Sequence, residues 1–182
     1  MNKQRAFTIT ELMITVAIVG ILVSVALPSL RHSLLNNRIT AKTNQFVSVL
    51  NYARSESIIG RNIRIEPLNK ISTSDEWGHG WVVADDANDN GEIDCTNLWD
   101  ADCEKLREFK FDDGIEVNGP DELDIILYDS RGQLAGNASK LNMSFVFCLE
   151  NATENDPTGR EVTIQATGRT ALTNREYPCA KP

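Results

Sequence analysis

Residues 7–30 read FTITELMITVAIVGILVSVALPSL, and the rest of the chain is organised around this stretch. Its apolar run extends from Leu12 to Leu27 and is followed by Pro28. As a helix, these 24 residues would be roughly 36 Å long at about 1.5 Å per residue, and the hydrocarbon core of a bilayer is about 30 Å thick. The stretch therefore predicts a transmembrane helix.

One charged residue, Glu11, lies within this stretch, near its start. An ionisable group at membrane depth costs at least a few kcal/mol, so it normally has a partner and a function. Lys3 and Arg5 precede the stretch with no acid among them, which favours a cytoplasmic N-terminus and transfer of the remaining chain across the membrane. No small-residue cleavage site follows the long apolar run, so we interpret it as an anchor and not as a secretory signal peptide.

The amino-terminal sequence resembles that of type IV prepilins. The resemblance rests on Ala6-Phe7-Thr8-Ile9-Thr10-Glu11, on the apolar run, and on Pro28 at the 22nd position counted from Phe7. It implies that a prepilin peptidase removes residues 1–6 by cutting between Ala6 and Phe7, and that the new amine is methylated. It also implies that Phe7, Glu11 and Pro28 serve assembly. Ala6 stands where the family prefers glycine.

A role of Glu11 in assembly can also be argued on physical grounds, independently of the resemblance. Cleavage would place the amine of Phe7 at the same depth as the carboxylate, where it can neutralise Glu11 within the chain or on a neighbouring subunit. Pairing between subunits would set the axial register of packed helices, because an unpaired buried charge is strongly disfavoured. The alternative is that Glu11 only caps the helix start, where a carboxylate suits the helix dipole.

The length of 182 residues predicts one domain plus the anchor: a leader at 1–6, a transmembrane and assembly helix at 7–30, and a periplasmic head at 31–182. Without the leader, 16 basic side chains remain against 26 acidic ones, a net charge of −10. A head this acidic is soluble and lacks the clustered cations that bind nucleic acid.

All four cysteines follow the anchor, and an even number in an oxidising compartment indicates disulfides. Three pairings are open, of which we favour Cys95–Cys103 and Cys148–Cys179. No zinc-like spacing of cysteine and histidine is present.

The head is predicted to be α+β. Apolar residues recur every three or four positions from Ser33 to about Ile58, which predicts that the helix continues, and Gly60 follows as a stop. Alternation with a period of two then indicates a strand at 62–66, and short strand candidates follow near 80–84, 106–111, 123–128, 143–149 and 161–167. Strands without intervening helices pair antiparallel, so the prediction is a long helix laid on antiparallel β-sheet, as in the type IV pilin fold.

Three head segments resemble the H-type pseudopilins of type II secretion and the type IV minor pilins FimT and FimU: residues 51–58, residues 77–91, and Gly168-Arg169-Thr170. The resemblance implies a minor pilin or pseudopilin that primes a pilus or pseudopilus or lies at its tip. Its partners would be other pilins, the prepilin peptidase and, before assembly, the inner membrane. The alternative is a membrane-tethered periplasmic binding module, such as a FimT-like DNA-uptake pilin, but acids interrupt the basic residues of the tail. No nucleophile and base accompany the acids, so we predict no enzymatic activity.

Residues 86–93 match the first half of an EF-type calcium loop, with Asp86, Asn88 and Asn90 at positions one, three and five and Glu92 as a further acid. Position twelve, however, is Asn97 and not the bidentate glutamate. The alternative, which we favour, is an Asn-Gly hairpin turn with solvated acids and no cofactor.

Overall fold

The computed structural model has one long helix, α1 (Ile9–Ile58, 50 residues), followed by β-strands. Thr8 precedes α1, the helix passes through Pro28, and Gly60 follows its end in a left-handed conformation with φ of 102°. The predicted continuation of the helix to about Ile58 is confirmed. The structure describes residues 8–68, 76–86, 105–110, 114–120, 125–136, 142–149 and 159–177.

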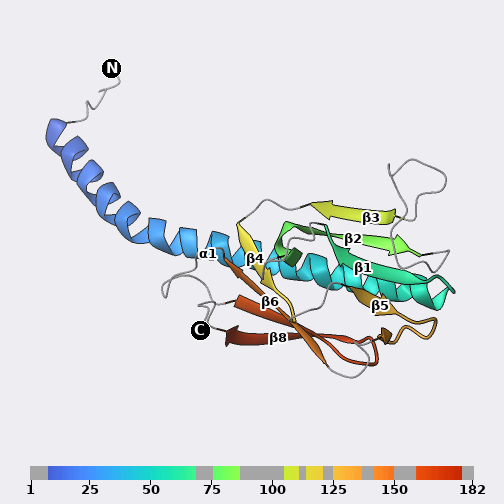
Figure 1. Ribbon diagram of the computed structural model, residues 1–182. Helices are drawn as coiled ribbons and strands as arrows, with labels where there is room; N and C mark the ends of the chain where they lie inside the picture. The colour runs from blue at the N-terminus through green and yellow to red at the C-terminus, as the bar shows by residue number, and fades with distance from the viewer. Residues whose placement is uncertain are drawn as a thin grey trace, which may run out of the picture.

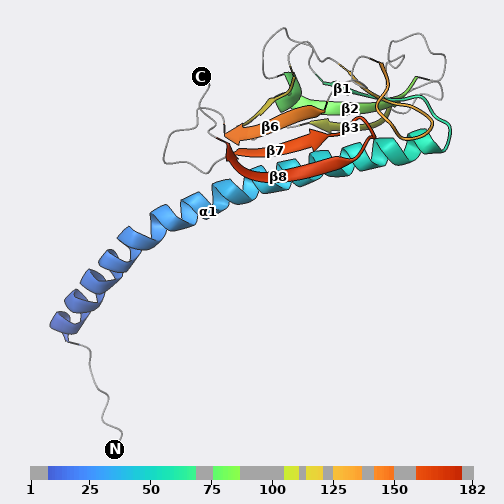
Figure 2. The same cartoon turned by 90° about the horizontal axis from the view of Figure 1, so that it is seen from below.

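The two halves of α1 have different surroundings. The amino-terminal half extends beyond the head and curves away from it, whereas the carboxy-terminal half lies along the strands (Figures 1 and 2). Its buried face begins at Ile39 and comprises Ile39, Lys42, Thr43, Phe46, Val49, Leu50, Ala53 and Ser57. This spacing of three and four residues is that of one helix face packed on a core.

The strands form two four-stranded sheets in which every pairing is antiparallel. The first sheet has the order β3 (Lys105–Lys110), β2 (Gly80–Asp85), β1 (Ile63–Pro67) and β5 (Ile126–Tyr128). The second has the order β4 (Ile115–Asn118), β6 (Met143–Leu149), β7 (Gly159–Ile164) and β8 (Thr170–Tyr177). A short 3-10 helix, η1 (Glu76–His79), leads into β2. α1 contacts both sheets, so the predicted α+β class and pilin-like arrangement are confirmed.

Most strand predictions match in position. β1, β2, β3 and β6 lie within one residue of the predicted segments, while β7 begins two residues earlier and ends three residues earlier than predicted. The predicted strand at 123–128 is shorter, since β5 begins at Ile126. β4 and β8 were not predicted, and each is an edge strand of the second sheet.

An aromatic cluster joins α1 to both sheets. The ring of Phe46 on α1 lies 4.6 Å from that of Trp81 on β2 and 4.9 Å from that of Phe145 on β6, measured between centroids. Trp77 packs edge-on against Phe145, and its carbonyl accepts a hydrogen bond of 2.8 Å from Trp81 Nε1. Aromatic pairs at these distances add roughly 0.5–1.5 kcal/mol beyond the area they bury. The cluster fixes the carboxy-terminal half of α1 to the head.

Arg54 holds two turns against the end of α1. Its Nε donates to the carbonyl of Gly132 at 2.8 Å, and its Nη2 donates to the carbonyl of Thr167 at 3.4 Å. Gly132 closes the turn after β5, and Gly168 closes the turn between β7 and β8. A Cβ on Gly168 would overlap the carbonyl oxygen of Gly132, so the two turns approach at glycine backbone. The residues that meet here are far apart in sequence.

The turn after β5 is held by Asp129. Its carboxylate accepts hydrogen bonds from the backbone N–H groups of Gln133 and Arg131, and the Arg131 guanidinium pairs with it at 2.8 Å. These bonds, led by the one from Gln133, hold the pKa of Asp129 below its ordinary value. Asp129 thus fixes the turn formed by residues 130–133.

Replacing Gly168 by alanine is expected to destabilise the head by at least about 2 kcal/mol, because left-handed strain at φ of 75° adds to the overlap with Gly132. Urea unfolding of the full chain in detergent, followed by tryptophan fluorescence, measures the loss. Gly60→Ala is the matched control, since Gly60 also has positive φ but its added Cβ meets nothing within 4 Å. Equal losses in the two variants would contradict the close approach of the two turns.

Candidate functional site

The exposed half of α1 is the candidate assembly site. Every large apolar side chain from Ile9 to Leu30 is between 45% and 79% exposed. In the described part of the chain, α1 is long and apolar enough to cross a membrane, and none of its most apolar stretch is buried by the head. Exposed apolar surface of this extent indicates a membrane or another protein as its partner.

Glu11 takes part in a capping box at the start of α1. Its carboxylate Oε2 accepts hydrogen bonds from the backbone N–H of Thr8 at 3.1 Å and from the Thr8 hydroxyl at 3.0 Å. The backbone N–H of Glu11 in turn donates to Thr8 Oγ1 at 3.3 Å. In the single chain, then, Glu11 caps its own helix. Ala6 and Phe7 lie outside the described residues, so the cut between them and the pairing of Glu11 with a Phe7 amine stay predictions.

Thr8 is the partner that sequence reasoning missed. The sequence did contain a signal for this contact, because a threonine followed three residues later by a glutamate is the capping-box pattern. Satisfying two of the free N–H groups at a helix start stabilises it by about 1 kcal/mol.

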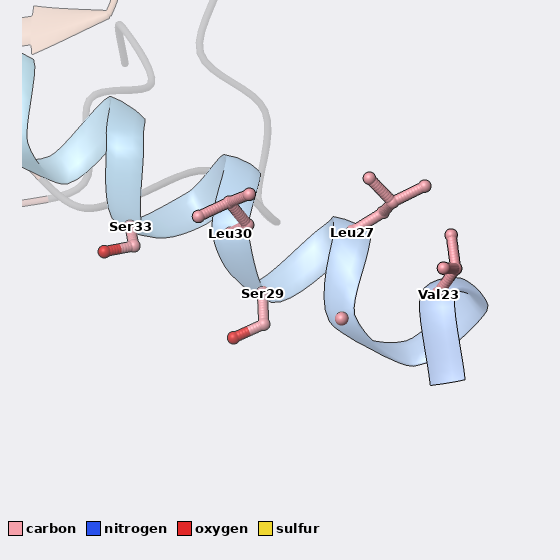
Figure 3. Close-up of a pocket in the computed structure, with 6 residues that line it drawn as sticks. Val23, Leu27, Ser29, Leu30 and Ser33 are labelled. Carbon is pink, nitrogen blue, oxygen red and sulfur yellow. The ribbon is translucent and has the colours of Figure 1, made fainter. Parts of the chain in front are cut away.

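Pro28 lies within α1 and does not end it. A proline lacks the N–H that would bond to the carbonyl four residues earlier, which here belongs to Ser24. Around it, Val23, Ala26, Leu27, Ser29, Leu30 and Ser33 line a shallow groove along the helix. Figure 3 shows Val23, Leu27 and Leu30 on one side of the helix and Ser29 on another. The groove is open along its length.

Of the four cysteines, Cys148 on β6 is the one described by the structure; it is buried and disulfide-bonded. Cys95, Cys103 and Cys179 lie outside the described residues. The choice among the three pairings therefore stays a prediction.

Of the candidate calcium ligands, Asp86 follows β2 and is buried. Its Oδ2 accepts a hydrogen bond of 2.9 Å from Arg64 Nη1, and Arg64 also forms an ion pair with Glu66. The side chains of all three residues are at most 6% exposed. Asn88, Asn90 and Glu92 lie outside the described residues, among which no three metal-ligating side chains cluster. Calcium binding thus stays a prediction.

Comparison with known proteins gives two family matches. The model of the family "Type II transport protein GspH" matches residues 42–168, and that of the prokaryotic N-terminal methylation motif matches residues 1–27. No curated protein matches the sequence significantly.

Two crystal forms of the type IV minor pilin FimU of Pseudomonas aeruginosa have a similar fold. The first is 22% identical, with a TM-score of 0.57 over 76% of this chain and 90% of that chain. The second is 23% identical, with a TM-score of 0.55 over 74% and 91%. At this level of sequence identity, the structural similarity to FimU establishes the fold of the chain.

Arg64→Gln is expected to destabilise the head by about 3–5 kcal/mol, because it removes a buried cation that pairs with two buried carboxylates. Arg61→Gln is the matched control. Arg61 pairs with Glu56 and Asp85, but its side chain is 45% exposed, so its loss is expected to cost less than about 1 kcal/mol. Urea midpoints of the two full-length variants in detergent provide the comparison, and a small effect of Arg64→Gln would contradict the buried ion-pair network.

Proposed function

Since the chain belongs to the family of the type II transport protein GspH, we propose that it is a minor pilin or pseudopilin that is incorporated into a type IV pilus or a type II secretion pseudopilus. There it primes assembly or lies at the tip. Proteins of this family and fold are structural, and the chain is not an enzyme.

The observation that carries this proposal is the division of α1 into two halves. The head buries one face of the carboxy-terminal half, whereas the amino-terminal half is exposed around its whole circumference. A rigid apolar rod of this kind is suited first to lipid and then to a bundle of like helices. The methylation motif at residues 1–27 supports the same use.

The proposal extends to processing and location. A prepilin peptidase cuts between Ala6 and Phe7, the segment 7–30 spans the inner membrane with its N-terminus in the cytoplasm, and the head from residue 31 is periplasmic. The disulfide at Cys148 supports an oxidising compartment for the head. After assembly the partners are other minor and major pilins or pseudopilins.

Binding of DNA is less well supported. Several cations of the described head are already paired with acids: Arg61 with Glu56, Lys110 with Glu108, and Arg131 with Asp129. Phosphate binding depends on cations that are available to the backbone of the nucleic acid. A FimT-like uptake function has no comparable observation in its favour.

Glu11→Ala is expected to leave membrane insertion intact and to abolish incorporation into filaments, because the helix bundle then lacks the charge that pairs with the Phe7 amine. Thr8→Ala is the matched variant, since it removes the cap but keeps the carboxylate. It is expected to incorporate at close to the normal level. Cell fractionation measures insertion, purified filaments measure incorporation, and intact mass is expected to give a mature chain that begins at Phe7.

Equal defects in the two variants would show that Glu11 acts only as a helix cap. A mature chain that retains Met1 in functional filaments would contradict the proposed processing.

A further inference from the structure

Two arginines lie where α1 leaves the predicted membrane span. Arg31 directly follows Leu30, and Arg38 comes seven residues later, just before the first buried residue, Ile39. Both side chains are exposed, and in the described part of the chain neither forms an ion pair. They contrast with Arg54, Arg61, Arg64 and Arg131, which bond to carbonyl oxygens or carboxylates of the head.

The helix places both arginines on one face, and their side chains tilt toward the bilayer. Seven residues are close to two turns, so Arg31 and Arg38 are about 10 Å apart along the helix axis. Each Cα–Cβ bond in a helix tilts toward the N-terminus, which here is the direction of the membrane. Since the headgroup layer extends roughly 5–7 Å beyond the hydrocarbon, Arg31 lies within it, and the long side chain of Arg38 reaches back to it.

The groove around Pro28 adjoins these arginines on the membrane side. Val23, Ala26, Leu27 and Leu30 give it an apolar floor at the depth of the hydrocarbon boundary. Ser29 and Ser33 also line the groove, and Figure 3 shows Ser29 turned away from Leu27 and Leu30. The apolar lining and the two arginines thus follow one another along the helix in the order of an acyl chain and a phosphate.

We propose that the exit of α1 binds an anionic phospholipid, with an acyl chain in the groove around Pro28 and the phosphate at Arg31 and Arg38. Charge complementarity favours this occupant. The mature chain carries a net side-chain charge of −10, so an anionic membrane repels the head, and among the described residues of α1 the cations nearest to the headgroups are Arg31 and Arg38.

This inference rests on the membrane anchor of the proposed function and adds a partner to it. Because neighbouring helices would pack on the same face, the lipid has to leave when the subunit enters a filament. The lipid would hold the subunit at the depth and rotation in which its head faces the periplasm.

The test uses the full-length chain in nanodiscs that contain phosphatidylglycerol and phosphatidylcholine in equal amounts. Native mass spectrometry measures which lipid remains on the protein after release. Each arginine near an anionic surface strengthens binding about fivefold, so enrichment of phosphatidylglycerol by about tenfold or more is expected. Arg31→Gln with Arg38→Gln should reduce the enrichment to about onefold, whereas Arg31→Lys with Arg38→Lys should keep most of it.

Arg61→Gln with Lys110→Gln is the matched control, because it removes two cations that the structure places on the head. It is expected to retain the enrichment. Ala26→Phe fills the groove without changing the charge and should lower retention of both lipids. Retained enrichment in the Arg31 and Arg38 glutamine variant, or equal retention of the two lipids by the unchanged chain, would overturn the proposal.

A neighbouring helix is the competing occupant of the groove. Cross-linking between two copies of the Ser33→Cys variant at a high lipid-to-protein ratio would show that a neighbouring helix occupies the groove. That result would also overturn the lipid proposal. Failure of the chain to insert into the nanodisc would instead contradict the anchor itself. Insertion without lipid selectivity leaves the proposed function standing and removes only this inference.

Discussion

The head cannot cover the amino-terminal half of α1, and this constraint governs the whole molecule. The helix continues for about thirty residues before its first buried side chain, Ile39, and its apolar residues up to Leu30 are exposed on every side. At roughly 25 cal/mol for each Å² of apolar surface, a rod of this composition is strongly unfavourable in water. The fold is therefore complete only in lipid or among other helices.

The other half of α1 shows how one helix can serve two environments. Its buried face, centred on Phe46, is fixed by the aromatic cluster with Trp81 and Phe145 and at its end by the bonds of Arg54 to two turns. Because α1 runs without a break through Pro28, the position of the head follows from the position of the anchor.

The sequence predicted the parts that depend on local pattern. The apolar run, the helix end near Ile58 and the strands β1, β2 and β6 were evident from the local sequence, although β1 alternates in sequence and is buried at every position. β8 was missed because Thr170–Tyr177 does not alternate clearly, and its strand conformation comes from pairing with β7. β4 has only four residues, too few for a pattern to be distinctive. The contact of Arg54 with Gly132 joins residues 78 positions apart, and no local pattern encodes it.

Thr8 changes how the charge at the start of α1 can be understood. While the subunit has no neighbour, the hydroxyl and the backbone N–H of Thr8 both donate hydrogen bonds to one carboxylate oxygen of Glu11, Oε2. Because a carboxylate has two oxygens, the proposed pairing with a Phe7 amine can add to these bonds without displacing them. The pairing would contribute most where water is excluded, as it is between packed helices. We therefore expect the cap to satisfy part of the Glu11 carboxylate in the single subunit, and the proposed Phe7 amine to add its charge in a filament.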